Sequence, residues 1–257
     1  MAGLADWYAA HGRHDLPWRA TRDPWAILVS EVMLQQTQVA RVLEAWPPFM
    51  AEFPDPATMA AASPGAVIAA WGRLGYPRRA RRLHDAAVVI VRDGWPEDLR
   101  DLPGVGAYTA GAIADQGDDA DLPAVDVNVR RVLERRAGRL LTPKEADAAY
   151  LRTGRPLRGR DRFLAIMDLG AAVCRARDPR CTECPLRRGC ATRGPLAGEV
   201  RNQQAPFEGS FRQRRGRVMA RLRDADAVAV RELDAEALES LVADGLAVVM
   251  RGRASLP

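Results

Sequence analysis

Four cysteines lie within seventeen residues of this chain, as Cys174, Cys181, Cys184 and Cys190. Their spacing, C-x6-C-x2-C-x5-C, brings four thiolates close enough to bind a tetrahedral metal ion or an iron–sulfur cluster. Two disulfides are the alternative, and the cytoplasmic compartment expected below disfavours them. The spacing by itself leaves zinc and an iron–sulfur cluster equally open.

A tight turn forms the second pattern, in the segment LPGVGAYT that starts at Leu102. Gly104 and Gly106 flank Val105, and two glycines let the backbone turn sharply and approach a ligand closely. The free N–H groups at the start of the following helix favour an anion. Such a turn can hold a DNA phosphate without reading the base sequence, although a GxG between helices is more often an ordinary loop.

Glu31 is a candidate general acid. It lies in the segment SEVMLQQT, and on a helix its neighbours at three and four positions are Ile27, Leu28, Leu34 and Gln35. A carboxyl group on an apolar stripe is costly to ionise, so we expect its pKa to rise. A glutamate at the solvated edge of a helix is the alternative interpretation.

Asp126 is a candidate for the opposite role. It lies in VDVNV, directly before a helical stretch, where aspartate usually caps the helix. Backbone N–H groups that bind a capping carboxylate also hold it ionised. One carboxyl that donates a proton and one that stays ionised are the pair that glycosidic bond cleavage needs.

Together, SEVMLQQT, LPGVG and the cysteine pattern after MDLGAAVC make the chain resemble the helix–hairpin–helix DNA glycosylases of the endonuclease III and MutY family. The resemblance covers about residues 5–195. It implies a [4Fe-4S] cluster on the four cysteines, with Arg187 and Arg188 of the same loop facing DNA phosphates. The cluster's implied role is structural, because it closes this loop.

The resemblance also implies a mostly α, two-lobed fold. A six-helix barrel lobe with the helix–hairpin–helix spans residues 21–126, and an iron–sulfur cluster lobe combines residues 1–20 and 127–195. A basic linker and a small, winged-helix-like C-terminal module follow over residues 196–257. This last segment is too short for the Nudix-like domain that long MutY proteins carry.

Three residues take catalytic roles in the family pattern. Glu31 protonates the adenine ring, and Asp126 stabilises the oxocarbenium-like sugar. Tyr108 stands where bifunctional members carry the lysine that forms a Schiff base, and it helps to position the sugar or water. Because the single lysine of the chain, Lys144, lies outside both motifs, the resemblance implies a glycosylase without strand cleavage.

The same pattern assigns the DNA contacts. Gln35 and Gln36 lie beside the mispaired base, and Tyr76 in GRLGY wedges into the base stack to offset the stacking lost on base extrusion. The hairpin contributes Gly104, Val105 and Gly106. The implied base pocket consists of Trp18, Arg19, Asn128 and Asp168.

The resulting hypothesis is removal of adenine mispaired with 8-oxoguanine or guanine in double-stranded DNA. Two rivals remain: a mismatch-specific thymine or uracil glycosylase on the same fold, and a non-catalytic iron–sulfur DNA-binding protein. The chain departs from the family at Val127, where glycine is usual, and at Pro77, where a second tyrosine is common. An acidic stretch, residues 115–121, replaces a largely apolar helix end, and we expect it to be frayed or exposed.

The elements that position these residues are predicted to be helices. Apolar spacing predicts one helix from Trp25 to Trp46, ended by Pro47-Pro48. Further helices are expected over residues 63–72, 78–92, 108–114, 126–133 and 161–173. A polar linker is expected over residues 194–217, then a helix over 234–243 and a strand over 246–250.

Charge and hydropathy are consistent with a DNA-binding protein. The chain of 257 residues carries a net charge of +5, and residues 174–223 hold thirteen arginines against four carboxylates. A basic patch suits phosphate contacts, while an arginine-rich proteome would explain the same count. Without a run of eighteen apolar residues or a signal peptide, we expect a cytoplasmic, nucleoid-associated monomer.

Overall fold

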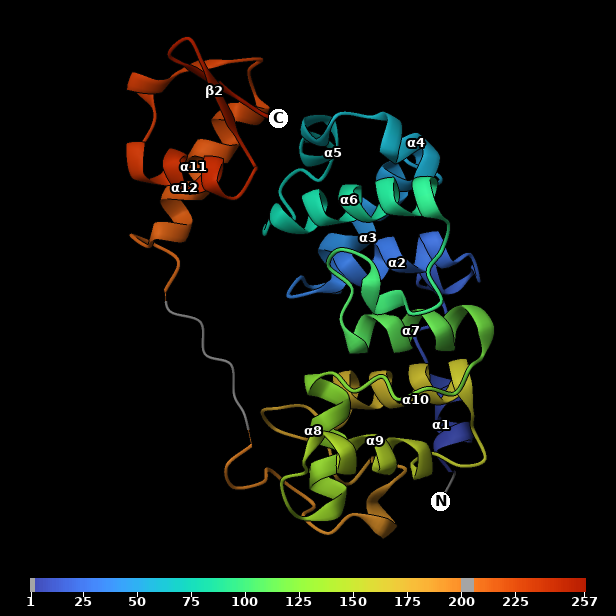
Figure 1. Cartoon of the computed structure of the whole chain (residues 1–257). Helices are drawn as coiled ribbons and strands as arrows, with labels where there is room; N and C mark the ends of the chain where they lie inside the picture. Colours follow the sequence, from blue (N-terminus) through green and yellow to red (C-terminus); the bar gives the residue numbers. More distant parts are fainter. Residues whose placement is uncertain (1–2, 200–205) are drawn as a thin grey trace. The chain divides into compact units, whose positions relative to one another are not determined.

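Helices form nearly all of the regular structure, as the sequence predicted for a mostly α protein (Figure 1). The computed structural model describes residues 3–199 and 206–257. The helices are α1 (Leu4–His11), α2 (Pro24–Leu34), α3 (Val39–Glu52), α4 (Pro56–Ala61), α5 (Pro64–Ala70), α6 (Arg78–Asp93), α7 (Ala107–Asp118), α8 (Val127–Ala137), α9 (Pro143–Arg152), α10 (Gly159–Ala172), α11 (Phe211–Arg223) and α12 (Ala235–Ala243). The strands β1 (Val228–Ala229), β2 (Val248–Met250) and β3 (Arg253–Ser255) form one small sheet.

Two units divide the chain. The first comprises residues 1–28 and 105–202, and the second comprises residues 29–104 and 203–257. The lobes expected from the sequence group residues 105–126 differently, and that division stays a prediction. No helix in the described part of the chain is long and apolar enough to cross a membrane.

Helices α7, α8 and α10 pack around the hydrophobic core of the first unit. Phe163 and Ile166 of α10 are at most 1% exposed, and burying such a side chain stabilises the fold by about 1.5–3 kcal/mol. The close approach of α10 to α8 favours glycine at position 170. A β-carbon there would lie only 3.1 Å from the β-carbon and the carbonyl oxygen of Asn128.

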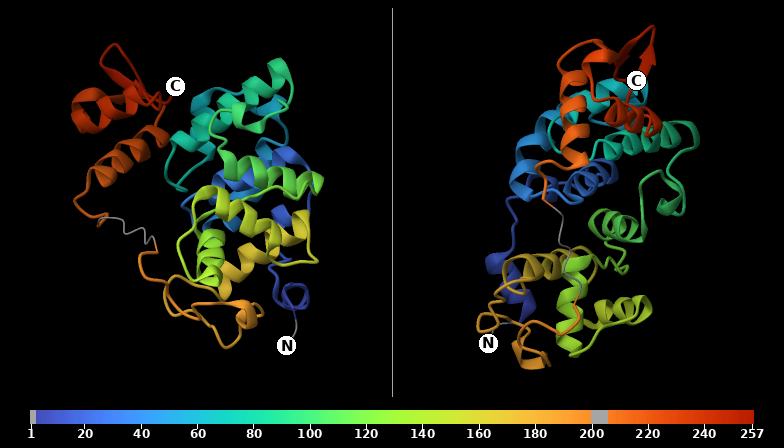
Figure 2. Two further views of the ribbon diagram at one scale, coloured as in Figure 1. Left: turned by 60° about the horizontal axis from the view of Figure 1, so that its bottom comes forward. Right: turned by 90° about the vertical axis from the view of Figure 1, so that its left-hand side faces the viewer.

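The segment after α10 returns alongside α8, as two views show (Figures 1 and 2). The amides of Ala191 and Thr192 donate to the carbonyls of Arg136 and Arg135 at the end of α8. The cysteine segment is therefore anchored to the helix that Asp126 begins.

The acidic segment after Ala114 is built into the first unit. Asp115 is fully buried, and its carboxylate accepts hydrogen bonds from the Leu122 amide (2.7 Å) and the Tyr150 hydroxyl (2.8 Å). Asp121 accepts from the Gly159 amide at the start of α10, where free N–H groups need partners. The expectation that residues 115–121 are frayed or exposed is therefore wrong for Asp115.

The long helix expected from Trp25 to Trp46 is divided into α2 and α3, with a turn at residues 35–38. The predicted stop at Pro47-Pro48 is also wrong, since both prolines lie inside α3. They are exposed, so water can bind the carbonyls that lose their amide partners. The next residue, Phe49, is 2% exposed and meets the Trp71 ring edge-on at 5.7 Å.

The C-terminal module begins earlier than the sequence predicted. Ser210 caps α11, so residues 211–217 are helical and the linker predicted over 194–217 is wrong in that part. The expected helix and strand near residues 234–243 and 246–250 are confirmed as α12 and β2. The sheet order is β1-β3-β2, with antiparallel pairing throughout.

Buried Asp115 makes the stability of the protein depend on pH. Burial raises its pKa to about 6, against about 3.9 in an unfolded chain. The native state then binds more protons than the unfolded state between these values, so the free energy of unfolding falls as the pH rises from about 4 to about 6. The loss reaches about 3 kcal/mol above this window.

We therefore expect Asp115→Asn to gain about 2–3 kcal/mol in unfolding free energy, relative to the parent, between pH 4.5 and pH 7.5. The amide keeps both hydrogen-bond partners and cannot ionise. Urea unfolding at the two pH values measures the difference, and Asp118→Asn, at an exposed position of the same helix, serves as the control. Parallel pH profiles for parent and Asp115→Asn would contradict the prediction.

Candidate active site

Glu31 occupies the last turn of α2, in the second unit. Its residue is 6% exposed, and its neighbours one turn earlier, Ile27 and Leu28, are fully buried. The buried, apolar setting that the sequence predicted is thus present. Its role as a general acid stays a prediction.

Asp126 is the N-cap of α8, in the first unit. One carboxylate oxygen accepts hydrogen bonds from the amides of Asn128 (2.8 Å) and Val129 (2.7 Å), and the other accepts from the Asn128 side chain (2.8 Å). The departure from the family at Val127 causes no crowding, since this first residue of α8 is 60% exposed. Asp126 is therefore held as a hydrogen-bond acceptor in a fixed orientation.

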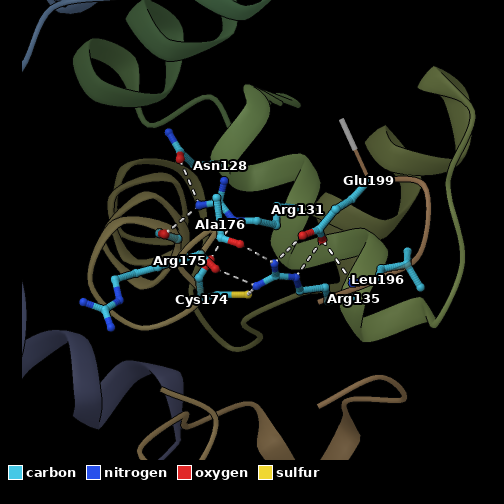
Figure 3. Close-up of polar contacts among 9 residues, drawn as sticks. Asn128, Arg131, Arg135, Cys174, Arg175, Ala176, Leu196 and Glu199 are labelled. Atoms are coloured by element: carbon cyan, nitrogen blue, oxygen red, sulfur yellow. Dashed lines mark hydrogen bonds and ion pairs between the residues drawn. The ribbon is translucent and has the colours of Figure 1, made fainter. Parts of the chain in front are cut away.

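A chain of contacts joins this cap to the cysteine segment. Arg131 donates to the Asn128 side-chain oxygen (2.9 Å), to the Gly170 carbonyl (2.8 Å) and to the Cys174 carbonyl (2.7 Å). These residues are brought together on the facing sides of α8 and α10 (Figure 3). Asp126 and Cys174, at the two ends of this series of contacts, were predicted from the sequence, but Arg131 was not. Its position one turn after Asn128 on the same helix was the available signal.

The four cysteines surround one hollow in the first unit. All four are free thiols, and Arg135, Val173 and Arg187 line the same hollow. In residues 3–199 and 206–257, no three His, Cys, Asp or Glu side chains are arranged as ligands of a single metal ion. Arg188, beside Arg187, is exposed.

Arg135 lies at the inner wall of this hollow and is 2% exposed. Its guanidinium group approaches Cys174 Sγ (3.7 Å), donates to the Arg175 carbonyl (2.8 Å) and pairs with the Glu199 carboxylate (2.5 Å) (Figure 3). Burial raises the pKa of the Cys174 thiol, and the charges of Arg135 and Arg131 oppose that rise. Sequence analysis missed both Arg135 and Glu199, because they lie 64 positions apart.

Asp168 on α10 is 1% exposed and surrounded by arginines. Arg19 donates to both carboxylate oxygens (2.7 and 2.8 Å), and Arg13 donates through its amide (2.9 Å) and its side chain (2.6 Å). Burial would raise the pKa of Asp168, but these partners outweigh it and hold the pKa below its usual range. Asp168 and Arg19 therefore form a fixed ion pair in the first unit.

Trp18, next to Arg19, is 2% exposed. Its indole is thus buried, and its predicted place in a base pocket stays a prediction. Tyr108 is the second residue of α7 and is partly buried against the core of the first unit, with its ring 6.3 Å from that of Phe163.

The hairpin has the geometry that its glycines predicted. Gly104 has a φ of +82°, and a β-carbon there would lie 3.0 Å from the β-carbon of Arg82. Gly106 is the N-cap residue of α7, while Val105 is 7% exposed. Gly104 and Gly106 are exposed, so the turn presents backbone rather than side chains to solvent.

Two turns of the second unit carry the remaining predicted DNA contacts. Gln36, in the turn between α2 and α3, has a φ of +56°, and Tyr76, directly before α6, has a φ of +47°. Gln36 is exposed, Gln35 is partly buried, and Tyr76 is 39% exposed. Both turns contact the buried side chain of Arg79, which the sequence analysis did not single out.

Comparison with known proteins places the chain in a family. Residues 29–152 match the model of the HhH-GPD superfamily base excision DNA repair proteins. An adenine DNA glycosylase of Mycobacterium tuberculosis is 45% identical, over 99% of this chain and 92% of that protein. The aligned region therefore includes the C-terminal module.

Solved structures agree on the fold. A thermostable thymine-DNA glycosylase is 27% identical and covers 74% of this chain and 93% of that one, with a TM-score of 0.66. An endonuclease III in a non-covalent DNA complex is 21% identical and covers 74% of this chain and 91% of that one, with a TM-score of 0.63. This chain therefore belongs to the HhH-GPD superfamily of base excision DNA repair proteins, and within it to the MutY-type adenine DNA glycosylases.

Proposed function

We propose that this protein is a monofunctional DNA glycosylase that hydrolyses the N-glycosidic bond of adenine mispaired with 8-oxoguanine or guanine. The observation that carries the proposal is the contrast between two carboxyl groups. Glu31 is buried in the last turn of α2, beside fully buried apolar side chains. Asp126 accepts three hydrogen bonds from N–H groups, which fix its carboxylate in one orientation at the start of α8.

These environments suit the two charges that develop during the reaction. Adenine becomes a leaving group when Glu31 donates a proton to its ring. The sugar then acquires positive charge, and the fixed carboxylate of Asp126 stabilises it. Tyr108 occupies the position of the Schiff-base lysine of bifunctional relatives, so we expect hydrolysis without strand cleavage.

DNA binding and base choice follow from the exposed groups of both units. Gln35 and Gln36 contact the region of the mispaired base, and Tyr76 fills the space that the extruded nucleotide leaves. The hairpin residues Gly104 to Gly106 bind a phosphate through backbone N–H groups. The base pocket combines Trp18, Arg19, Asn128 and Asp168, with Arg19 and Asp168 acting as the ion pair described above.

The main alternative is a thymine or uracil glycosylase, since a thymine-DNA glycosylase shares the fold. That similarity extends over 74% of the chain, whereas the mycobacterial adenine glycosylase aligns over 99%. The C-terminal module is thus included in the alignment with that mycobacterial adenine glycosylase. Its element order, with the β2–β3 hairpin last, supports a winged-helix-like arrangement.

We further propose that Cys174, Cys181, Cys184 and Cys190 hold a [4Fe-4S] cluster. Four free thiols around one hollow form a fitting ligand set. The cluster would cross-link the loop that carries Arg187 and Arg188, which we expect to face DNA phosphates. The partner is double-stranded DNA, and we expect a monomer associated with the nucleoid of the cytoplasm.

The substrate proposal predicts a specific excision pattern. In a single-turnover assay, we expect adenine release from duplexes with A opposite 8-oxoguanine or G, and none from T:G, U:G or A:T. Glu31→Gln and Asp126→Asn should each lower the rate by at least about 100-fold, because each removes one of the two charge roles. Strand cleavage should appear only after alkali treatment.

Release of thymine or uracil would be compatible with the fold but would contradict adenine as the substrate base. Full activity of Glu31→Gln would contradict the role of Glu31 as the general acid. Exposed Glu44→Gln on α3 is a matched control, and we expect it to retain the parent rate.

The cluster proposal predicts a visible change. The purified protein should be brown with absorbance near 400 nm, and Cys184→Ser should lose that absorbance because one thiolate ligand is removed. Elemental analysis should find about four iron atoms per chain in the parent. A colourless parent that contains one zinc ion would show that the thiols hold a different metal.

A further inference from the structure

The side chain of Arg79 joins the two turns to which DNA contacts are assigned. It lies on the first turn of α6, and its residue is 9% exposed. One terminal nitrogen donates to the carbonyls of Val32 (2.7 Å), Met33 (3.0 Å) and Gln35 (2.5 Å). These are carbonyls at the C-terminal end of α2, which lack intrahelical donors and attract a cation.

The other terminal nitrogen reaches both turns. It donates to the Thr37 hydroxyl (3.0 Å), directly after Gln36, and to the Gly75 carbonyl (3.1 Å), directly before Tyr76. The Gly75 carbonyl also accepts from the Trp71 indole (3.0 Å). One planar guanidinium group therefore binds both the turn at residues 35–38 and the turn that precedes α6.

Aromatic rings complete the surroundings of this cation. The guanidinium carbon lies 5.2 Å from the centre of the Trp71 ring and 5.4 Å from that of the Tyr76 ring. Both distances allow cation–π attraction. Burial lowers the pKa of Arg79 to about 10, so the group remains charged at neutral pH.

Both turns need such support. Gln36 and Tyr76 adopt left-handed backbone conformations, which strain a non-glycine residue and persist only where neighbouring contacts hold them. We propose that Arg79 is a positioning residue that holds the Gln35–Gln36 turn and the Tyr76 turn as one rigid unit, so that both enter the DNA together. This inference rests on the DNA contacts assigned under the proposed function.

Lysine cannot replace arginine in this position. It has the charge, but its single nitrogen carries three donors and lacks the planar fork that reaches five acceptors on two segments, residues 32–37 and Gly75. Arg79→Lys should therefore leave the turns individually mobile while it keeps the net charge. Arg92→Lys, at an exposed position of the same helix, is the matched control.

Wedge insertion can be measured separately from excision. A duplex with 2-aminopurine beside an A:G mispair gains fluorescence when bases unstack. At saturating protein, we expect Arg79→Lys to lose at least half of the gain seen with the parent, and to lower the single-turnover rate by about 10- to 100-fold. Arg92→Lys should match the parent in both measurements.

A double-mutant cycle with Tyr76→Ala separates positioning from general destabilisation. If Arg79 acts through the Tyr76 wedge, the single-turnover rate of the double variant Arg79→Lys, Tyr76→Ala should be within about three-fold of the rate of Tyr76→Ala alone, since contacting residues couple. A double variant whose rate is lowered by the product of the two single fold-losses would overturn the proposal. If Arg79→Lys does not fold, Thr37→Val removes a single acceptor of Arg79 and should give a smaller loss of fluorescence gain, while an unchanged gain would overturn the proposal.

The two hypotheses fail in different ways. A parent protein that raises the fluorescence but releases no adenine overturns the proposed function, and the fluorescence of the variants still tests Arg79. A parent that releases adenine, with Arg79→Lys indistinguishable from it in fluorescence and rate, overturns only the role of Arg79.

Discussion

A buried guanidinium group must be surrounded by acceptors, and this requirement organises the loops that carry the proposed site. Leaving its N–H groups without partners would cost several kcal/mol each. The terminal nitrogens of Arg79 bind carbonyls of two turns, although its Nε has no hydrogen-bond partner among the described residues. Arg131 binds the Asn128 side chain and the Cys174 carbonyl, and Arg135 binds Glu199 and the cysteine segment. Each arginine therefore fixes irregular backbone that has few hydrogen bonds of its own.

This arrangement explains why a chain with one lysine uses arginine inside its structure. A lysine ammonium is a point charge with three donors, whereas the guanidinium fork binds several carbonyls in fixed directions. Carbonyls at helix ends and in turns are the acceptors that remain free after secondary structure has formed. The arginines thus convert unsatisfied backbone groups into contacts between segments, and Arg79 binds both the turn near Gln36 and the turn before Tyr76.

Local signals in the sequence predicted much of the fold and the residue environments. Asp126 caps α8 as expected, and the helix expected over residues 63–72 begins at Ser63, which caps α5, because capping depends only on the next few residues. Helical periodicity left burial of Glu31 and a solvated helix edge both open, and the family resemblance favoured the buried acid; Glu31 is 6% exposed. The break between α2 and α3 could not be predicted in this way, since the carbonyls at the end of α2 are bound by Arg79 from a distant segment.

The prediction that the acidic residues 115–121 are exposed was wrong for Asp115 for a related reason. A run of aspartates predicts exposure when its partners are unknown, but Tyr150 and the start of α10 lie about 35 to 40 positions away. The start of helix α9 was predicted only as one of two alternatives, a loop or a helix start around Lys144, although TPKE contains a capping box with proline at the first helical position. That signal was local and could have been used.

Charge counted along the chain also differs from charge presented at the surface. Residues 174–223 contain thirteen arginines, which suggested a basic patch for phosphates. In the C-terminal module, however, Arg214 pairs with Asp234 and Glu236, and Arg215 pairs with Asp244. These carboxylates lie outside the counted segment, so the excess positive charge is partly neutralised within the module.

The phosphate contacts that the proposed reaction needs are therefore better sought elsewhere. The hairpin offers exposed backbone at Gly104 and Gly106, and the loop with Arg187 and Arg188 offers an exposed charge.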